Sequence, residues 1–146
     1  SNKQNYIKNE KSFCFTYGDG VSDIDITKLI KFHNEHGKDA TLTAAFSPAR
    51  FGALNIENNQ ITSFTEKPQG DGALINGGFF VLSPNVLKRI TGDDCVWEQE
   101  PLNGLAFDGN LMAYSHKGFW QPMDTVREMI YLQELWDKNE APWKSW

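Results

Sequence analysis

Two aspartates at predicted loop positions, Asp19 and Asp124, are the side chains in this sequence best placed for chemistry. Asp19 follows a short apolar run and is flanked by glycines, and Asp124 stands just before a segment with helical periodicity. Mg²⁺ binds a few hard oxygen ligands together with phosphate oxygens and water. The two carboxylates could therefore hold a magnesium ion against a phosphate-bearing substrate. Alone, each has a simpler explanation, an Asp-Gly turn for Asp19 and a helix N-cap for Asp124.

A second group of polar residues, in the middle of the chain, suits a sugar phosphate. Glu66 and Lys67 end a predicted strand, where the carboxylate can accept hydroxyl hydrogen bonds and the ammonium can meet a phosphate. Asn76 could hydrogen-bond a hydroxyl, and the following Gly77 and Gly78 mark a bulge or a close approach of the backbone to another group. A solvated ion pair and a purely structural bulge stay open as alternatives.

Short apolar runs predict the elements that deliver these residues. Residues 12–17 have the pattern of a buried strand that ends at the acidic turn, and a helix capped by Asp25 and closed by Gly37 should follow it. Residues 40–46 have the pattern of the next strand, so we expect the two strands to form a parallel pair with a right-handed crossover. Open parallel sheets bind ligands at the carboxyl ends of their strands, which is where the acidic turn falls.

The rest of the chain has the pattern of alternating strands and helices. A hairpin turn is expected over residues 57–59, and Thr125 is expected to cap the last helix. The predicted strands are 53–56, 60–65, 75–82 and 111–115, and the predicted helices are 83–90, 100–107 and 125–138. This order predicts an α/β fold whose middle is mostly sheet.

Length and composition predict one globular domain, residues 12–146. The chain has 146 residues, 40% of them hydrophobic, and a net charge of −5 with acids and bases interspersed. No basic stripe is present to neutralise a phosphate backbone, so we expect no nucleic-acid partner. The apolar runs are far shorter than the roughly 20 residues that cross a bilayer, which predicts a cytoplasmic protein with no membrane partner. Residues 1–11 are polar and unpatterned, and we expect a tag remnant or a flexible lead-in there.

Cysteine and histidine chemistry is not indicated. Cys14 and Cys95 lack paired spacing and suit a reducing compartment. The three histidines, His33, His36 and His116, have neither metal-ligand spacing nor a neighbouring nucleophile, so we expect structural or surface roles for them. No serine lies in a G-x-S-x-G turn, which leaves a serine hydrolase unsupported.

A set of longer peptides carries more information than any single residue. In chain order they are FTYGDG, ATLTAAF, RFGALNI, FTEKPQGDGALINGGFFVL, WEQEPL, GFWQPMDT and LWDKNEAPWKSW. Taken together, and over the stretch from about Phe13 to Trp146, they resemble the glucose-1-phosphate cytidylyltransferase family of sugar nucleotidyltransferases. Glycine-rich turns are common, but this collection is specific.

The resemblance implies an enzyme in which an oxygen of glucose-1-phosphate attacks the α-phosphate of CTP. Pyrophosphate leaves, and CDP-glucose forms with Mg²⁺ as the cofactor. Such a transfer needs positioning and charge neutralisation more than covalent chemistry by the protein. The resemblance further implies a cytoplasmic homo-oligomer that serves nucleotide-sugar biosynthesis, including that of the lipopolysaccharide O-antigen.

The resemblance also assigns roles to the residues singled out above. It makes Asp19 and Asp124 the catalytic residues and the metal ligands. It implies side chains that contact the hexose hydroxyls and the sugar phosphate, and backbone that borders the hexose or the nucleotide. These substrate-binding residues are Tyr17, Gly18, Glu66, Lys67, Asn76 and Gly77.

The implied fold is a partial Rossmann-like, GT-A-like mixed sheet with flanking helices. The family opens with a glycine-rich loop, G-G-x-G-T-R-L followed by a lysine, that holds the triphosphate, and this sequence has none. We therefore expect a C-terminal, sugar-binding part of the domain, without the nucleotide-binding strands and weakly active or inactive alone. The strand at residues 12–17 would then have an exposed edge, which favours an oligomer.

Two other interpretations stay open. The chain could be a truncated remnant that binds sugar phosphate or a protein partner without catalysis. It could also come from a nucleotidyltransferase that uses UTP, GTP or dTTP, because those enzymes share the fold and the metal-binding carboxylates. The base pocket lies outside this sequence.

Overall fold

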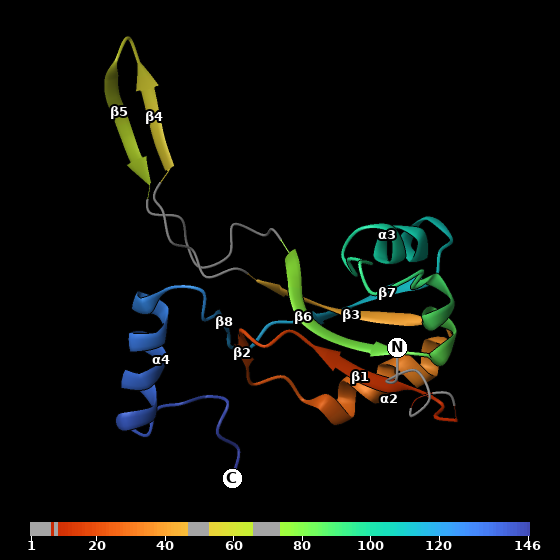
Figure 1. Cartoon of the computed structure of the whole chain (residues 1–146). Helices are drawn as coiled ribbons and strands as arrows, with labels where there is room; N and C mark the ends of the chain where they lie inside the picture. Colours follow the sequence, from red (N-terminus) through yellow and green to blue (C-terminus); the bar gives the residue numbers. More distant parts are fainter. Residues whose placement is uncertain (1–6, 8, 47–52, 66–73) are drawn as a thin grey trace.

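The centre of the fold is a four-stranded sheet in the order β1-β6-β3-β7 (Figure 1). The computed structural model describes residues 7, 9–46, 53–65 and 74–146. These strands span Phe13–Thr16 (β1), Leu74–Leu82 (β6), Ala40–Phe46 (β3) and Leu111–His116 (β7). β6 runs antiparallel to both of its neighbours, whereas β3 and β7 are parallel. The α/β fold with a mixed sheet is therefore confirmed.

One predicted pairing is wrong. β1 and β3 do not form a parallel pair, because β6 lies between them and pairs with both. The reason is the composition of β6, which is apolar along most of its nine residues and buried over its second half. A strand that is apolar on both faces is more stable in the middle of a sheet than at its edge. The chain between β1 and β3 therefore crosses over one intervening strand.

The helix and hairpin signals were more reliable. Helix α2 spans Ile26–His36, where the Asp25 side chain accepts a hydrogen bond from the Lys28 backbone and Gly37 has φ of +66°. β4 (Ala53–Glu57) and β5 (Gln60–Thr65) form the expected hairpin as a separate two-stranded sheet. Its turn has positive φ at both central asparagines, Asn58 and Asn59, as a tight hairpin with right-handed strand twist requires.

The second half of the chain follows the predicted order with one difference in helix type. α3 spans Glu100–Phe107 and α4 spans Val126–Asp137, as expected. The segment after β6 is a 3₁₀ helix, η1 (Pro84–Arg89), and its Ser83 N-cap makes no side-chain capping bond. The 3₁₀ form is used mostly in short pieces, including connectors between other elements, as here after β6.

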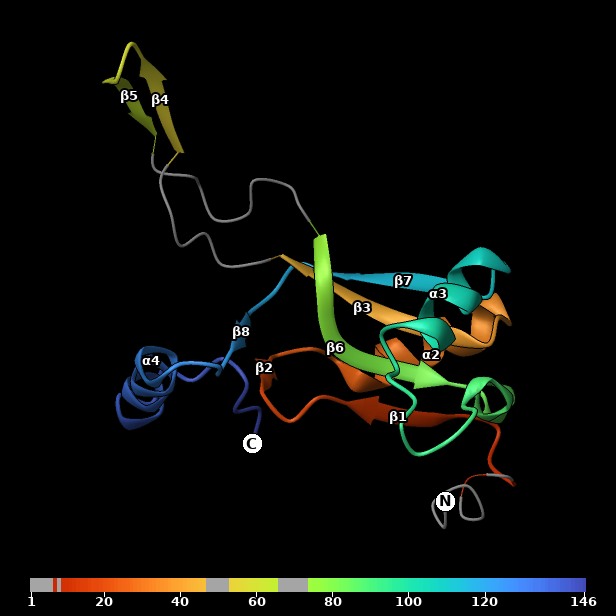
Figure 2. The same ribbon diagram turned by 45° about the horizontal axis from the view of Figure 1, so that its top comes forward.

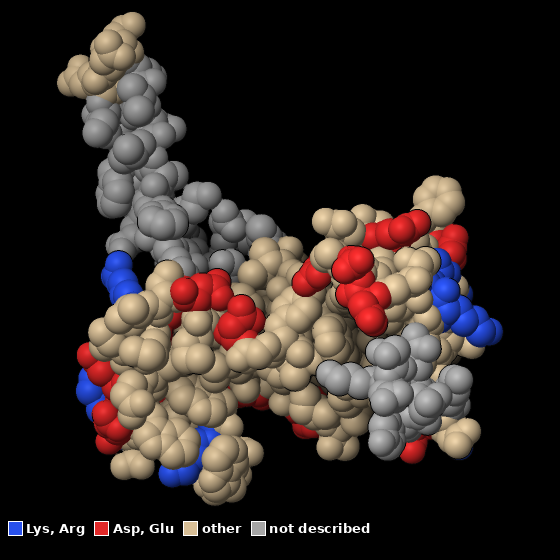
Figure 3. Space-filling view, viewed as in Figure 1, with Lys and Arg blue, Asp and Glu red and all other residues tan. Residues whose placement is uncertain are grey.

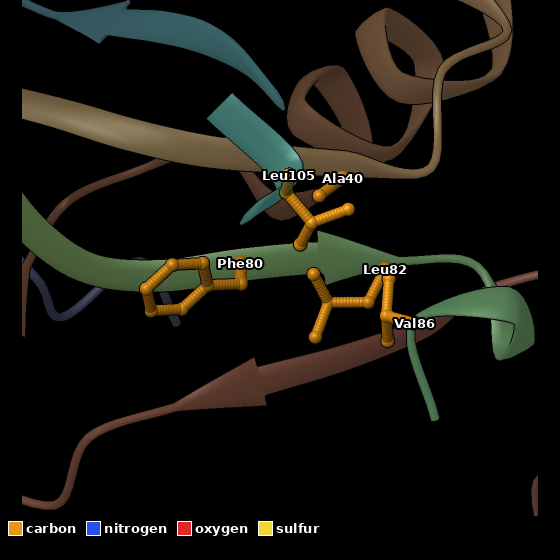
Figure 4. Packing of buried hydrophobic residues seen from close by; sticks show 5 residues of the cluster. All are labelled: Ala40, Phe80, Leu82, Val86 and Leu105. Atoms are coloured by element: carbon orange, nitrogen blue, oxygen red, sulfur yellow. The ribbon is translucent and has the colours of Figure 1, made fainter. Parts of the chain in front are cut away.

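Helices cover both faces of the sheet (Figures 1 and 2). On one face, side chains from β3 and β6 pack against η1 and α3, and the buried cluster is Ala40, Phe80, Leu82, Val86 and Leu105 (Figure 4). α2 covers the opposite face and buries Leu29 and His33. Burying both faces of the central strands fixes the position of the strand ends, where the predicted site residues lie.

The surface agrees with the charge pattern of the sequence. On the face shown in Figure 3, acidic and basic side chains are scattered, and no continuous basic area is visible among the described residues. No helix within the described ranges has the length and apolar character needed to cross a membrane.

Two histidines meet one buried threonine between α2 and β3. Thr41 is fully buried, and its hydroxyl lies 2.9 Å from Nδ1 of His33 and 2.6 Å from Nε2 of His36. The Lys38 backbone N–H donates to Nδ1 of His36, so His36 carries its proton on Nε2 and donates to Thr41. The Thr41 hydroxyl can then donate to Nδ1 of His33. This arrangement satisfies every group only when both imidazoles are neutral.

We predict that stability falls as the pH drops below about 6.5, the ordinary pKa of histidine. Burial is the main cause that lowers the pKa of both His33 and His36. The neighbouring His36 lowers the pKa of His33 further, and Asp39 partly offsets this. Lys38 lowers the pKa of His36 further. In the unfolded chain both histidines take up protons first, so acid favours unfolding, by at most about 1.4 kcal/mol per pH unit for each proton.

Urea unfolding followed by circular dichroism measures how the free energy of unfolding changes with pH. The range from about pH 7.5 to about pH 5.5 extends roughly one unit to each side of the ordinary histidine pKa. His33→Gln, which keeps an acceptor for Thr41 but cannot titrate, should flatten this pH dependence. Equal slopes in the two proteins would contradict the prediction.

Candidate active site

Two short strands bring the segments of Asp19 and Asp124 together. β2 (Gly20–Ser22) pairs antiparallel with β8 (Trp120–Pro122), with Gly20 opposite Pro122. Beyond this register the Met123 backbone N–H donates to the Asp19 carbonyl at 2.7 Å. Figure 1 shows β2 and β8 side by side at the end of the large sheet. The two exposed aspartates therefore stand on adjoining backbone, although 105 positions separate them in the numbering.

Side chains reinforce this β2–β8 bridge at its far end. The Ser22 hydroxyl donates to the Phe119 carbonyl at 2.8 Å. His116 Nε2 lies 2.8 Å from a carboxylate oxygen of Asp23 and 3.1 Å from the same Phe119 carbonyl. A Cβ on Gly118 would fall 2.5 Å from Asp23, so this corner is also sterically closed. The contacts give His116 the structural role expected for it.

The start of α4 holds Asp124 in place through Glu128. The Thr125 side chain accepts from the Glu128 N–H, while Glu128 Oε2 accepts from the backbone N–H groups of Asp124 at 2.7 Å and Thr125 at 2.9 Å. Thr125 is thus the N-cap, in a capping box. The simpler interpretation of Asp124 as the helix cap is wrong, since Thr125 occupies the N-cap position.

Gly77 lies where β6 contacts β8 of the bridge, and the space there is too small for a side chain. Nε1 of Trp120 donates to the Gly77 carbonyl at 2.9 Å. A Cβ on Gly77 would lie 3.0 Å from the Thr43 carbonyl and 3.2 Å from the Ala45 Cβ. The glycine therefore lets three chain segments meet closely, which accounts for its place in a central strand.

Tyr17 and Asn76 form a polar pair at the carboxyl end of β1. Asn76 Nδ2 donates to the Tyr17 hydroxyl at 3.2 Å, and Asn76 Oδ1 accepts from the Gly78 N–H at 2.9 Å. Gly78 has φ of +77°, and a Cβ there would strike the Tyr17 ring at 2.7 Å. Burial raises the pKa of Tyr17 to about 12, with smaller contributions from Glu98 and Asp19, so the phenol remains protonated at neutral pH.

Six of the predicted site residues lie within the described ranges and are brought to one end of the sheet: Tyr17, Gly18, Asp19, Asn76, Gly77 and Asp124. A Cβ on Gly18 would meet nothing within 4 Å, so space remains beside the acidic turn. Glu66 and Lys67 lie outside the described residues.

The two aspartates offer hard oxygen donors, the ligand type that Mg²⁺ binds. No group of three or more His, Cys, Asp or Glu side chains within the described ranges could enclose a metal ion. Two exposed carboxylates match a site that fills its remaining positions with substrate phosphate oxygens and water, which is how Mg²⁺ is usually held.

Sequence reasoning missed the residues that position the aspartates. Trp120, His116 and Glu128 act through their contacts to backbone or to other positioning residues. Glu128 had a readable signal, because Thr125 and Glu128 have the T-x-x-E spacing of a capping box. The partners of Trp120 and His116 are distant in sequence, and no local pattern indicates them.

Comparison with known proteins defines the class. The sequence family described as nucleotidyl transferase matches residues 1–116, and the chain belongs to this family. Its fold is shared by solved structures at low identity. HddC from Yersinia pseudotuberculosis aligns with a TM-score of 0.66 and 24% identity, over 92% of this chain and 59% of that one. A putative glucose-1-phosphate thymidylyltransferase from Bacillus anthracis aligns with a TM-score of 0.61 and 16% identity, over 98% of this chain and 58% of that one.

Relatives with higher sequence identity are glucose-1-phosphate cytidylyltransferases. The glucose-1-phosphate cytidylyltransferase of Salmonella typhi is 61% identical over 141 residues, which are 97% of this chain and 55% of the relative. The probable glucose-1-phosphate cytidylyltransferase of Bacillus subtilis is 40% identical over 98% of this chain and 56% of the relative. The predicted resemblance is confirmed, and the chain spans little more than half the length of these relatives.

The capping box at α4 supplies a stability prediction. Glu128→Ala removes a carboxylate that is 5% exposed and accepts two backbone N–H groups, so unfolding should become easier by about 1–3 kcal/mol. Glu134→Ala is the matched control on the same helix, since its exposed ion pair with Lys138, at 3.8 Å, contributes little. Urea unfolding of both variants measures the difference, and equal losses would show that the Glu128 contacts do not stabilise the site.

Proposed function

We propose that this chain provides the sugar- and metal-binding part of a glucose-1-phosphate cytidylyltransferase, which makes CDP-glucose and pyrophosphate from CTP and glucose-1-phosphate. The observation that carries the proposal is the β2–β8 bridge, which puts Asp19 and Asp124 on adjoining backbone beside Tyr17 and Asn76. Identity of 61% to the Salmonella typhi cytidylyltransferase, over 97% of the chain, supports the choice of reaction.

In the proposed reaction, an oxygen of the sugar phosphate forms a bond to the α-phosphorus of CTP. The bond from that phosphorus to the oxygen leading to the β-phosphate breaks, and pyrophosphate leaves with the electron pair. Asp19 and Asp124 would hold Mg²⁺, which when bound neutralises phosphate charge and aligns the two reactants. Glu128 and the bridge hold the backbone that carries the two carboxylates, which limits the reorganisation needed as charge develops.

The proposed sugar site lies around Tyr17 and Asn76. The Asn76 amide has two N–H donors, and Tyr17 takes one of them, which leaves the other for a hexose hydroxyl. Gly18 leaves open space, and Gly77 lets the backbone approach. Glu66 and Lys67, outside the described residues, complete the proposed set at the hydroxyls and at the sugar phosphate.

Relatives with other nucleotides make the base a separate part of the proposal. The mannose-1-phosphate guanylyltransferase catalytic subunit beta of Xenopus tropicalis is 33% identical over 90% of this chain. CTP is favoured because the two cytidylyltransferases match at 61% and 40%. We further propose a cytoplasmic homo-oligomer in nucleotide-sugar and O-antigen biosynthesis. In support of an oligomer, Phe15 on β1 is 38% exposed, and within the described residues β1 pairs only with β6.

The test transplants this chain into the Salmonella typhi relative in place of the 141 residues that it matches. The hybrid should form CDP-glucose with Mg²⁺ and CTP, and much less product with UTP, GTP or dTTP. Asp19→Asn and Asp124→Asn should each lower kcat/KM about 100-fold or more, the scale expected for losing transition-state charge stabilisation.

Asp137→Asn is the control, since Asp137 is exposed on α4 and keeps an acceptor for Gln133 as asparagine. A folded hybrid that uses another nucleotide would overturn the choice of CTP. A folded hybrid with no transfer would favour the interpretation of the chain as a non-catalytic sugar-phosphate binder.

A further inference from the structure

The segment before α3 carries a carboxylate to the end of β1. Trp97 anchors this segment, because its ring lies 6.0 Å from that of Phe15 and 5.7 Å from that of Phe80, between centroids. Its carbonyl accepts from the Leu102 N–H at 3.1 Å, at the start of α3. Phe80 is 1% exposed, so Trp97 is fixed on the hydrophobic core and the position of Glu98 follows from it.

The rings of Tyr17 and Trp97 both pack on Phe80, with centroids 5.6 Å and 5.7 Å from it, so Glu98, the residue after Trp97, lies on the Tyr17 side of the core. Glu98 is exposed, and its carboxylate interacts with the Tyr17 hydroxyl. The Tyr17 hydroxyl accepts from Asn76 Nδ2 at 3.2 Å, so its own proton is available for the Glu98 carboxylate. Three groups from three separate segments thus form a continuous polar row, Asn76, Tyr17 and Glu98. A carboxylate has about four acceptor positions, and one bond to Tyr17 leaves most of them available.

This row complements a hydroxyl better than it complements a phosphate. A sugar hydroxyl donates one hydrogen bond and accepts others, and here Glu98 only accepts while the second N–H of Asn76 only donates. The negative charge of Glu98 disfavours a phosphate at the same place, and the proposed phosphate position lies at the other end, with Asp19 and Asp124. The hexose ring would thus extend from the two aspartates toward Glu98.

We propose that Glu98 is a specificity-determining residue of the sugar site, whose carboxylate accepts a hydrogen bond from one hydroxyl of the hexose. The inference rests on the proposed function and extends it to a residue outside the set assigned there. A bound sugar would remove water from this exposed carboxylate, and an acceptor that loses water without gaining a donor costs binding energy, so sugars that lack this hydroxyl should bind more weakly.

The experiment titrates the isotopically labelled chain with glucose-1-phosphate and Mg²⁺ and follows its amide NMR signals, which report both folding and weak binding. Glu98→Ala should weaken binding about 10- to 100-fold, the range for losing a hydrogen bond to a charged group. Glu100→Ala, an exposed glutamate two positions further on, is the matched control and should bind as the wild type does.

A panel of monodeoxy analogues, each lacking one hydroxyl, separates direct contact from a structural effect. For one analogue, the wild type and Glu98→Ala should bind equally weakly, because the hydroxyl and its acceptor form one pair. Two results would overturn the assignment of Glu98 and leave the proposed sugar site standing. One is that Glu98→Ala binds every analogue more weakly than the wild type by the same factor. The other is that a folded Glu98→Ala chain binds glucose-1-phosphate as the wild type does. Absence of binding by the folded wild type would overturn the proposed sugar site and the assignment of Glu98 with it.

Discussion

The hydrogen bond from the Met123 N–H to the Asp19 carbonyl, at 2.7 Å, is the contact on which the candidate site depends. It continues the β2–β8 pairing and joins two segments that the sequence keeps far apart. A single backbone hydrogen bond contributes only about 1 kcal/mol, so it cannot close this long stretch of chain alone. The four-stranded sheet brings the segments close, and the bridge then sets their register.

The sheet performs this task because β6 lies in its middle. β6 pairs with β1, and Tyr17 and the acidic turn follow the end of β1. The carbonyl of Gly77, in β6, accepts a hydrogen bond from the Trp120 side chain of β8. Two adjacent glycines weaken a strand, and their cost here is offset by burial of Phe80 and Leu82 further along it. The same strand therefore stabilises the core at one end and admits close backbone contacts at the other.

Much of the fold could be predicted from local patterns, and the exceptions have a physical cause. Caps such as Asp25 and Gly37, the turn at Asn58 and Asn59, and the apolar runs of β3 and β6 act within a few residues, so they are legible in one sequence. The choice of strand neighbours depends on long-range pairing, which is why the insertion of β6 between β1 and β3 was missed. β2 and β8 have three residues each, too few for a periodic signal.

The candidate site was predictable to the same degree. The types of Asp19, Asn76 and Asp124 suggested their chemistry, but only the three-dimensional pairing places Asp19 and Asp124 together and assigns the helix cap to Thr125 instead. The contacts of Trp120 and Glu98 are with Gly77 and Tyr17 respectively, more than 40 positions away in the numbering, and no local pattern encodes them.

The central claim is that Asp19 and Asp124 form one divalent-cation site, and Mn²⁺ tests it most directly. Mn²⁺ accepts the same oxygen ligands as Mg²⁺, and it broadens the amide NMR signals of nearby residues. The account predicts selective broadening at residues 18–20 and 123–125 together, lost at both segments in Asp19→Asn. Broadening confined to one segment, or unchanged by that substitution, would contradict it.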